Sequence, residues 1–197
     1  MKTKKILVLA LAALLLVVVS VAGTVAYLTA TSGPVTNTFT PTTLIVGLAE
    51  TQPENKTAPM IPGTTIAKDP KVTYSTDVPA YVFVEVTEAI GEGLTFSNYI
   101  GYSVITGTDK WQQVTGVNNV YYMEVAAGNS PEGGISVIQD ISTTPVADQV
   151  TVKADLELAD MTKLDAETKY PTLTFNAYII QKDPFATAAD AWAELNP

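Results

Sequence analysis

The 197-residue sequence contains no cysteine, no histidine and no arginine. Without cysteine the chain has no disulfide framework and no thiol nucleophile. Without cysteine and histidine the usual ligands of zinc are missing, and serine–histidine catalysis is excluded. The lack of arginine removes the forked donors that commonly bind phosphate. We therefore predict no bound cofactor and no metal centre, and a fold that depends on its hydrophobic core alone.

Charge of one sign is also scarce. The eleven basic residues are all lysines and stand against twenty acidic residues, which gives a net charge of −9. Three of these lysines lie within the first five residues, so loss of that segment would leave a net charge of −12. So acidic a chain is not expected to bind nucleic acid. A solvated acidic surface is a simpler explanation of the charge than an acidic binding site.

The N-terminus has the order of a secretory signal peptide: a positive start, an apolar run over residues 6–22 and then small residues. Cleavage is predicted after Ala26, so that the mature chain begins at Tyr27, with Ala22 as the alternative site. An uncleaved anchor is the competing interpretation, because about 20 apolar residues suffice to span a bilayer. We expect a secreted, extracellular or cell-surface protein that meets the membrane only through this segment before cleavage.

Residues 27–197 have the length of a single domain, and alternation of apolar and polar residues dominates them. Ala80, Val82, Val84 and Val86 share one face of a predicted strand, opposite Tyr81 and Phe83. The same pattern predicts a strand over 150–158, with Val150, Val152, Leu156 and Leu158 on its apolar face, and another over 173–179. Weaker candidates are 35–40, 43–48, 71–75, 99–105, 120–125 and 135–141. Many short strands without intervening helices predict an all-β fold, an antiparallel β-sandwich.

Two segments depart from this alternation. The stretch 51–63 holds three prolines and is predicted to be a surface loop. Near the C-terminus, Asp183 and Pro184 are suited to begin a short helix. Phe185, Ala188, Ala189, Trp192 and Leu195 then fall on one face of it. We expect this helix to close one end of the sandwich through Trp192; a partner-binding helix is the alternative.

Residues with binding chemistry are few. Asp155 and Glu157 would share one strand face, and Asp160, Asp165 and Glu167 would follow in a loop, so calcium could find oxygen ligands there. The spacing matches no calcium-loop pattern, and a solvated acidic edge is the simpler interpretation. Trp111, Tyr121 and Tyr122 could form a platform on which sugars stack, although such residues more often pack within strands.

The segment 27–40 is predicted to be an exchangeable N-terminal strand. It carries no charge, and Val35, Asn37 and Phe39 alternate with three threonines. Once the signal peptide is removed nothing precedes this strand, so it could complete its own sheet or add to the sheet of a neighbouring subunit. Sequence alone leaves both possibilities open.

Several short motifs resemble the TasA and camelysin family of exported Gram-positive proteins, whose signal peptides are removed by a SipW-type peptidase. They are Ala26-Tyr27-Leu28-Thr29, Asn37-Thr38-Phe39-Thr40, Ile66-Ala67-Lys68-Asp69-Pro70-Lys71-Val72, Asp77-Val78-Pro79-Ala80-Tyr81-Val82, and Leu173-Thr174-Phe175-Asn176-Ala177-Tyr178 followed by Ala191-Trp192. The sequence departs from the family at Pro41 and Thr42, where a glycine is usual, and at residues 30–32, where acidic residues are common.

The resemblance implies a jelly-roll-like β-sandwich and a structural role as a subunit of cell-surface or biofilm-matrix fibres. It thereby favours self-association, through the strand 27–40, or binding to other matrix proteins. A camelysin-like metallopeptidase is an alternative, although this chain lacks the histidines that a zinc peptidase normally uses. A carbohydrate-binding adhesin is another. We expect a protein that is not an enzyme.

Overall fold

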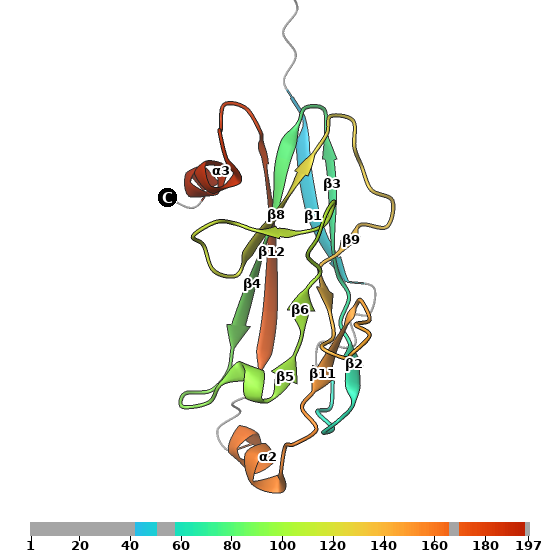
Figure 1. The fold of residues 1–197 in the computed structure, drawn as a ribbon, viewed down its shortest axis with the longest axis vertical. Coiled ribbons are helices and arrows are strands. Elements are labelled where there is room, and N and C mark those ends of the chain that lie inside the picture. The colour runs from blue at the N-terminus through green and yellow to red at the C-terminus, as the bar shows by residue number, and fades with distance from the viewer. Residues whose placement is uncertain (1–41, 51–57, 166–169, 196–197) are drawn as a thin grey trace, which may run out of the picture. The chain divides into compact units, whose positions relative to one another are not determined.

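The structure is a computed structural model that describes residues 42–50, 58–165 and 170–195. These residues belong to one compact unit, which spans 41–197 (Figure 1). The described strands are β1 (Leu44–Glu50), β2 (Thr65–Ala67), β3 (Pro70–Thr76), β4 (Ala80–Ala89), β5 (Ile100–Gly101), β6 (Ser103–Val104), β7 (Gln112–Gln113), β8 (Val120–Val125), β9 (Ile135–Ser136), β10 (Ile138–Gln139), β11 (Gln149–Val152) and β12 (Thr172–Gln181). The helices are the short 3-10 helix η2 (Phe96–Asn98), α2 (Leu158–Asp165) and α3 (Ala188–Leu195). The chain is therefore mainly β, as predicted.

The largest sheet has the strand order β12-β4-β8-β7, and every neighbouring pair in it is antiparallel. β4 lies inside this sheet and pairs along its whole length with β12, from Ala80 opposite Gln181 to Ala89 opposite Thr172. The predicted alternation of β4 is confirmed. Val82 and Val84 are fully buried on one face, and Phe83 is fully buried on the other.

The remaining strands form three smaller antiparallel sheets, ordered β1-β3-β9, β2-β11-β5 and β10-β6. Their apolar side chains pack with one face of β4 and β12 into the main core. This core contains Val72, Tyr74, Val82, Val84, Val86, Ile100, Trp111, Val137, Ile138, Val152, Leu164 and Phe175, among other buried residues. Burial of that face supplies the main hydrophobic stabilisation of the fold.

The opposite face of the four-stranded sheet carries a second, smaller cluster with α3 over it (Figure 1). The ring of Trp192 lies 5.3 Å from that of Phe83 and 5.2 Å from that of Tyr178, between ring centroids. The predicted C-terminal helix and its anchor are confirmed, but its predicted start was wrong. The helix begins at Ala188 rather than near Asp183, because Thr187 and Asp190 form a reciprocal capping box.

The strand predicted over 150–158 was also wrong beyond Val152. The backbone turns after Lys153, and Leu156 lies half-buried in the turn that leads to α2. Leu158 begins that helix and is 84% exposed. The alternating apolar residues of this stretch therefore do not form a strand. Asp155 and Glu157 have low strand propensity and no strand partner among the described residues.

The weaker strand candidates are confirmed where the structure describes them. The candidates 43–48, 71–75 and 120–125 correspond to β1, β3 and β8, whereas 99–105 and 135–141 are each divided into two short strands. β2 and β7 were not predicted. Of the predicted loop 51–63, residues 58–63 contain no helix or strand. Residues 51–57 and the candidate strand 35–40 lie outside the described residues.

Candidate functional site

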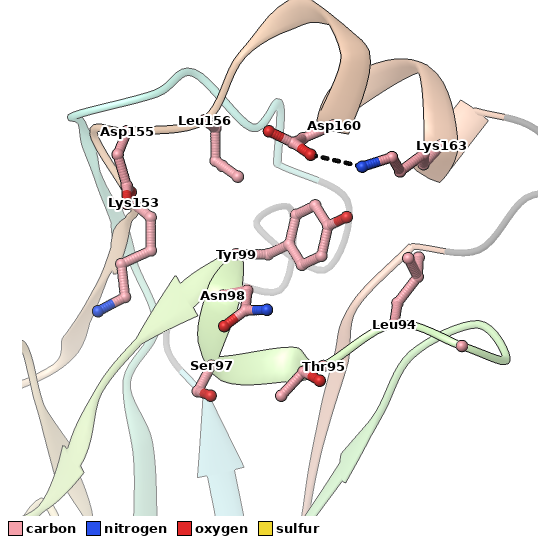
Figure 2. Close-up of a pocket in the computed structure, with 11 residues that line it drawn as sticks. Leu94, Thr95, Ser97, Asn98, Tyr99, Lys153, Asp155, Leu156, Asp160 and Lys163 are labelled. Carbon is pink, nitrogen blue, oxygen red and sulfur yellow. Dashed lines mark hydrogen bonds and ion pairs between the residues drawn. The ribbon is translucent and has the colours of Figure 1, made fainter.

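A polar pocket of about 430 Å³ lies near α2, and sequence analysis did not predict it (Figure 2). One wall is the segment 93–99, which includes η2. The other is the stretch 153–163, which follows β11 and enters α2. A backbone hydrogen bond joins the two walls, because the Lys153 N–H donates to the Tyr99 carbonyl at 2.9 Å. The pocket therefore unites segments that are more than fifty residues apart in the chain.

Local backbone geometry sets the shape of the first wall. Gly93 has a φ of 77°, in the left-handed region that residues with a side chain rarely adopt. The Leu94 N–H donates to the Gly91 carbonyl at 3.1 Å and closes this turn. The 3-10 turn follows, and the Tyr99 N–H donates to the Phe96 carbonyl at 2.9 Å. Phe96 and Tyr99 are both buried, so the polar residues between them face the pocket side.

The pocket lining is mainly polar, with a smaller apolar part. Tyr99 is 4% exposed, and Leu94 and Leu156 are half-buried. Around them lie the exposed hydroxyl and amide groups of Thr95, Ser97 and Asn98, with Lys153 and Asp155 on the other wall (Figure 2). These five polar side chains have no hydrogen-bond or ion-pair partner within the described part of the chain.

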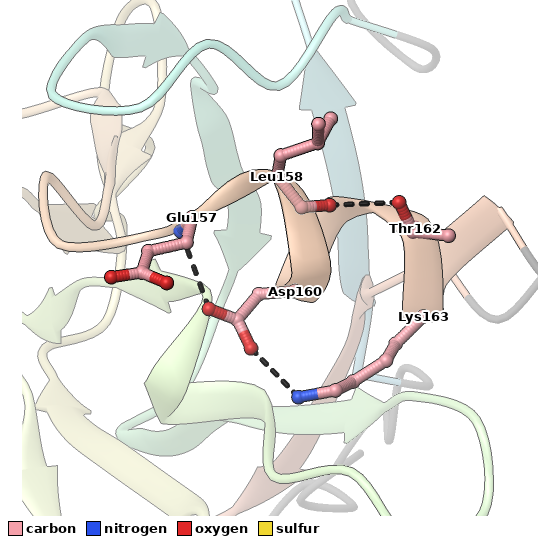
Figure 3. A network of polar contacts seen from close by, with 5 residues as sticks. All are labelled: Glu157, Leu158, Asp160, Thr162 and Lys163. Atoms are coloured by element: carbon pink, nitrogen blue, oxygen red, sulfur yellow. Dashed lines mark hydrogen bonds and ion pairs between the residues drawn. The ribbon is translucent and has the colours of Figure 1, made fainter.

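Two further pocket residues, Asp160 and Lys163, belong to a polar network at the start of α2 (Figure 3). The Asp160 carboxylate accepts from the Glu157 N–H at 3.2 Å and from the Lys163 ammonium at 2.8 Å. The Lys163 ammonium, followed by the Glu157 N–H, lowers the pKa of Asp160 below its ordinary range. Hydrogen bonding to Asp160 correspondingly raises the pKa of Lys163. Asp160 thus acts as a helix cap rather than as a proton donor.

Those residues considered for calcium that the structure describes are not gathered into a metal site. Among the residues that the structure describes, no three histidine, cysteine, aspartate or glutamate side chains form a group that could hold a metal ion. Asp155 and Glu157 do not share a strand face, because β11 ends before them. Asp165 accepts a hydrogen bond from the Tyr170 hydroxyl at 3.0 Å. Glu167 lies outside the described ranges.

The aromatic residues considered for sugar stacking do not form a platform. Trp111 is 1% exposed, and its indole N–H donates to the Ser136 carbonyl at 3.0 Å. Tyr121 and Tyr122 lie on opposite faces of β8, the first with the main core and the second with the cluster beneath α3. The packing interpretation accounts for all three, because neighbouring residues of a strand point to opposite faces.

Asp140 is a buried carboxylate whose hydrogen bonds hold a loop in place. It is 2% exposed, and its oxygens accept hydrogen bonds from the Val146 N–H at 3.0 Å, the Ser142 hydroxyl at 2.8 Å and the Gln149 amide at 2.6 Å. The Val146 N–H is the main cause of its lowered pKa. Because these donors favour the ionised form, Asp140 fixes the loop 140–146 and is not suited to act as a general acid.

The strand edges form a second candidate site. In the four-stranded sheet one terminal strand, β7, has two residues, whereas the other, β12, has ten. The sheet β1-β3-β9 is similar, with a two-residue strand at one end and the seven-residue β1 at the other. β1 and β12 approach each other without belonging to one sheet. Within the described residues, each of these long strands pairs on one side only.

The two long edge strands contain none of the lysines and prolines that often protect an edge strand. β12 contains no charged residue and no proline. β1 is uncharged up to Glu50, which forms an ion pair with Lys68 at 2.6 Å, and its Ile45 and Leu48 are 57% and 43% exposed. Soluble proteins usually cover such edges or protect them with lysine, proline or a bulge.

The remaining predicted site residues lie outside the described residues. They are Ala26 and Tyr27 at the predicted cleavage site, and Val35, Asn37 and Phe39 in the predicted assembly strand. Neither α2 nor α3 has the length and apolar composition that crossing a membrane requires, and no other helix within the described ranges has them. Comparison with protein-family models, with curated proteins and with solved structures finds no match to this chain.

Proposed function

We propose that this chain is an exported structural protein, a subunit of cell-surface or biofilm-matrix fibres that assembles by β-strand addition. The observation that carries the proposal is the ten-residue edge of β12, which is uncharged and unpaired on one side within the described part of the chain. Main-chain N–H and C=O groups along such an edge are available to a strand from another subunit. The proposed overall fold is a jelly-roll-like β-sandwich.

The sequence supplies a strand that suits this edge. Residues 27–40 are uncharged and alternate in the pattern of a strand, and they immediately precede the described unit. Docking on a neighbouring subunit would bury Val35 and Phe39, each of which contributes about 1.5–3 kcal/mol when fully buried. Because the donor strand and the acceptor edge are different surfaces, the contact is head-to-tail, and repetition of such a contact produces a fibre when the subunits do not close into a ring.

The chemistry of the described residues agrees better with this role than with a peptidase. The chain has no histidine or cysteine. The carboxylates with shifted pKa values, Asp140 and Asp160, are both shifted downward by hydrogen bonds. A general acid at neutral pH needs a shift in the other direction. A fibre subunit requires a stable sheet and an open edge but no reactive group.

Deletion of residues 27–40 tests the proposal. Electron microscopy should show filaments of the protein that begins at Tyr27, and the truncated protein should remain folded and monomeric. If the segment is instead an ordinary first strand of its own sheet, the truncated protein should lose much of its stability in urea. Filaments formed by the truncated protein would overturn the proposal.

A matched pair of substitutions tests the edge itself. Thr174 on β12 lies directly opposite Thr87 on β4, and both are exposed. Thr174→Lys places a charge on the edge strand and should slow fibre growth, because a lysine must be desolvated when another strand docks there. Thr87→Lys places the same charge on an inner strand and should slow growth less. Equal growth rates for the two variants would exclude β12 as the acceptor edge.

A further inference from the structure

The pocket between η2 and α2 lies apart from the strand edges and serves no evident purpose in strand addition. Its walls are joined by the backbone hydrogen bond between Lys153 and Tyr99. The Asp160–Lys163 ion pair lies on the helix that borders the pocket (Figure 2). A volume of about 430 Å³ falls within the range of small-molecule sites. Two hydrogen-bonded backbone segments, 93–99 and 153–163, therefore define the walls of the site.

The free polar groups of the pocket indicate what kind of molecule it would bind. Thr95 and Ser97 offer hydroxyls that donate and accept, and Asn98 offers an amide that does both. None of these side chains has a partner among the described residues. A ligand with several hydroxyl groups matches this mixture, because each hydroxyl both donates and accepts a hydrogen bond.

The positive and negative side chains that line the pocket are equal in number. Asp160 and Lys163 are paired with each other at 2.8 Å, and the unpaired Lys153 and Asp155 contribute one charge of each sign. The chain as a whole is strongly acidic, with a net charge of −9. A polyanion would be repelled by this field, and a polycation would find no cluster of carboxylates in the pocket. The electrostatics thus favour a neutral ligand.

Three apolar or aromatic side chains form the smaller part of the pocket lining. Leu94 and Leu156 reach the pocket from opposite walls, with Tyr99 between them (Figure 2). A sugar ring presents C–H groups on its faces and hydroxyls at its edge. The apolar side chains of the pocket suit the first surface, and the polar side chains around them suit the second. From this geometry we propose that the pocket binds a neutral saccharide of about one or two rings.

The proposed site binds without hydrolysing. Glycosidases normally pair an ionised carboxylate with a second carboxyl whose pKa is raised. Asp160 has a lowered pKa because it accepts from Lys163 and from the Glu157 N–H. Its carboxylate is held as a helix cap and has no proton to donate at neutral pH. We therefore expect retention of the sugar at the surface and no change in its glycosidic bond.

Heteronuclear NMR of the purified protein tests this proposal. The probes are maltose, cellobiose and N,N′-diacetylchitobiose, each at about 10 mM, where millimolar affinity is detectable. At least one should shift amide signals confined to residues 93–99 and 153–163. Absence of such shifts with all three, or stronger binding of an oligogalacturonate used as a charged probe, would overturn the proposal.

A pair of asparagine variants supplies the control. Asn98→Ala removes an exposed pocket amide and should weaken binding by about tenfold. Asn118→Ala removes an exposed amide in the turn before β8, outside the pocket, and should leave binding unchanged. Both side chains are exposed, so both variants should fold, and their unperturbed spectra elsewhere would show it. Equal affinity of the two variants would place the binding outside this pocket.

Discussion

The two eight-residue helices, α2 and α3, begin in the same way and are held in different ways. In each, an aspartate in the first turn accepts a hydrogen bond from a backbone N–H one turn earlier: Asp160 from Glu157, and Asp190 from Thr187. α3 buries Ala188, Ala191 and Trp192, whereas α2 buries Leu164 alone. The two helices lie at opposite ends of the described unit (Figure 1).

The difference shows that a helix cap fixes where a helix begins but not how firmly it is attached. Short helices gain most of their stability from packing rather than from their own propensity. α3 packs an aromatic ring against Phe83 and Tyr178, while the first residue of α2, Leu158, is 84% exposed. We therefore expect α3 to unfold with the sheet and α2 to open more readily.

The largest expected effect is that of Trp192→Ala. Removal of the ring leaves a cavity over Phe83, and the free energy of unfolding should fall by about 3–5 kcal/mol. Urea denaturation would measure the change. Glu194→Ala, on the exposed side of the same helix, should change stability by less than about 0.5 kcal/mol. Similar midpoints for the two variants would mean that α3 is not anchored through its tryptophan.

Leu164→Ala is the corresponding change in α2. Leu164 is 1% exposed and packs into the main core, so the loss should be about 2–4 kcal/mol. Hydrogen exchange should in addition show loss of protection confined to 158–165 and the adjoining pocket. Leu158→Ala in the same helix serves as the control, because that side chain is already in water. Unchanged protection of α2 in Leu164→Ala would show that other contacts hold it.

Thr187→Ala tests how much the N-terminal cap of α3 contributes to stability. The Thr187 hydroxyl accepts from the Asp190 N–H at 3.2 Å and donates to its carboxylate at 2.7 Å. Loss of this cap should lower the free energy of unfolding by about 1 kcal/mol. Thr187→Ser keeps the hydroxyl and should restore most of the stability in thermal unfolding. A serine variant as unstable as the alanine variant would assign the effect to packing of the methyl group.

The smallest expected effect is the loss of stability at low pH that comes from Asp160. Because its folded-state pKa is lowered, the Asp160 carboxylate stabilises the start of α2 above its unfolded-state pKa. That contribution is lost as the pH falls through the lowered value. Carboxyl-carbon NMR should find Asp160 titrating below an ordinary aspartate. Lys163→Gln removes the main cause and should move the pKa upward, and an unchanged titration in that variant would contradict the assigned cause.

The sequence predicted best those elements whose burial follows a simple period. Residues 80–86 alternate between two buried faces, and this alternation correctly predicted β4. The apolar face that includes Trp192 correctly predicted α3. α2 gave no such pattern, because it buries only Leu164, and the alternation around Leu156 even favoured a strand there. The Lys153 N–H, just after Val152, donates to the Tyr99 carbonyl, and no local sequence pattern contains this long-range hydrogen bond.

The pocket could not be predicted for a related reason. The sequence indicates Asp155 and Asp160 as candidate oxygen ligands, but the residues across the pocket, Ser97 and Asn98, come from a separate segment. Only the fold brings these residues together. The open edge of β12 was likewise hidden, because whether a strand is terminal depends on the order of the sheet and not on its own residues.

The pairing of β4 with β12 has a consequence for the time at which this sheet can close. Glu85 on β4 and Asn176 on β12 are hydrogen-bonded at 3.2 Å and stand 91 residues apart in the chain. At a synthesis rate of roughly 5–20 residues per second, β4 emerges about 5–20 seconds before its partner. During that interval the two apolar faces of β4 and the edge that pairs with β12 remain exposed. Protection of the unfinished chain against premature association is therefore a requirement built into the strand order.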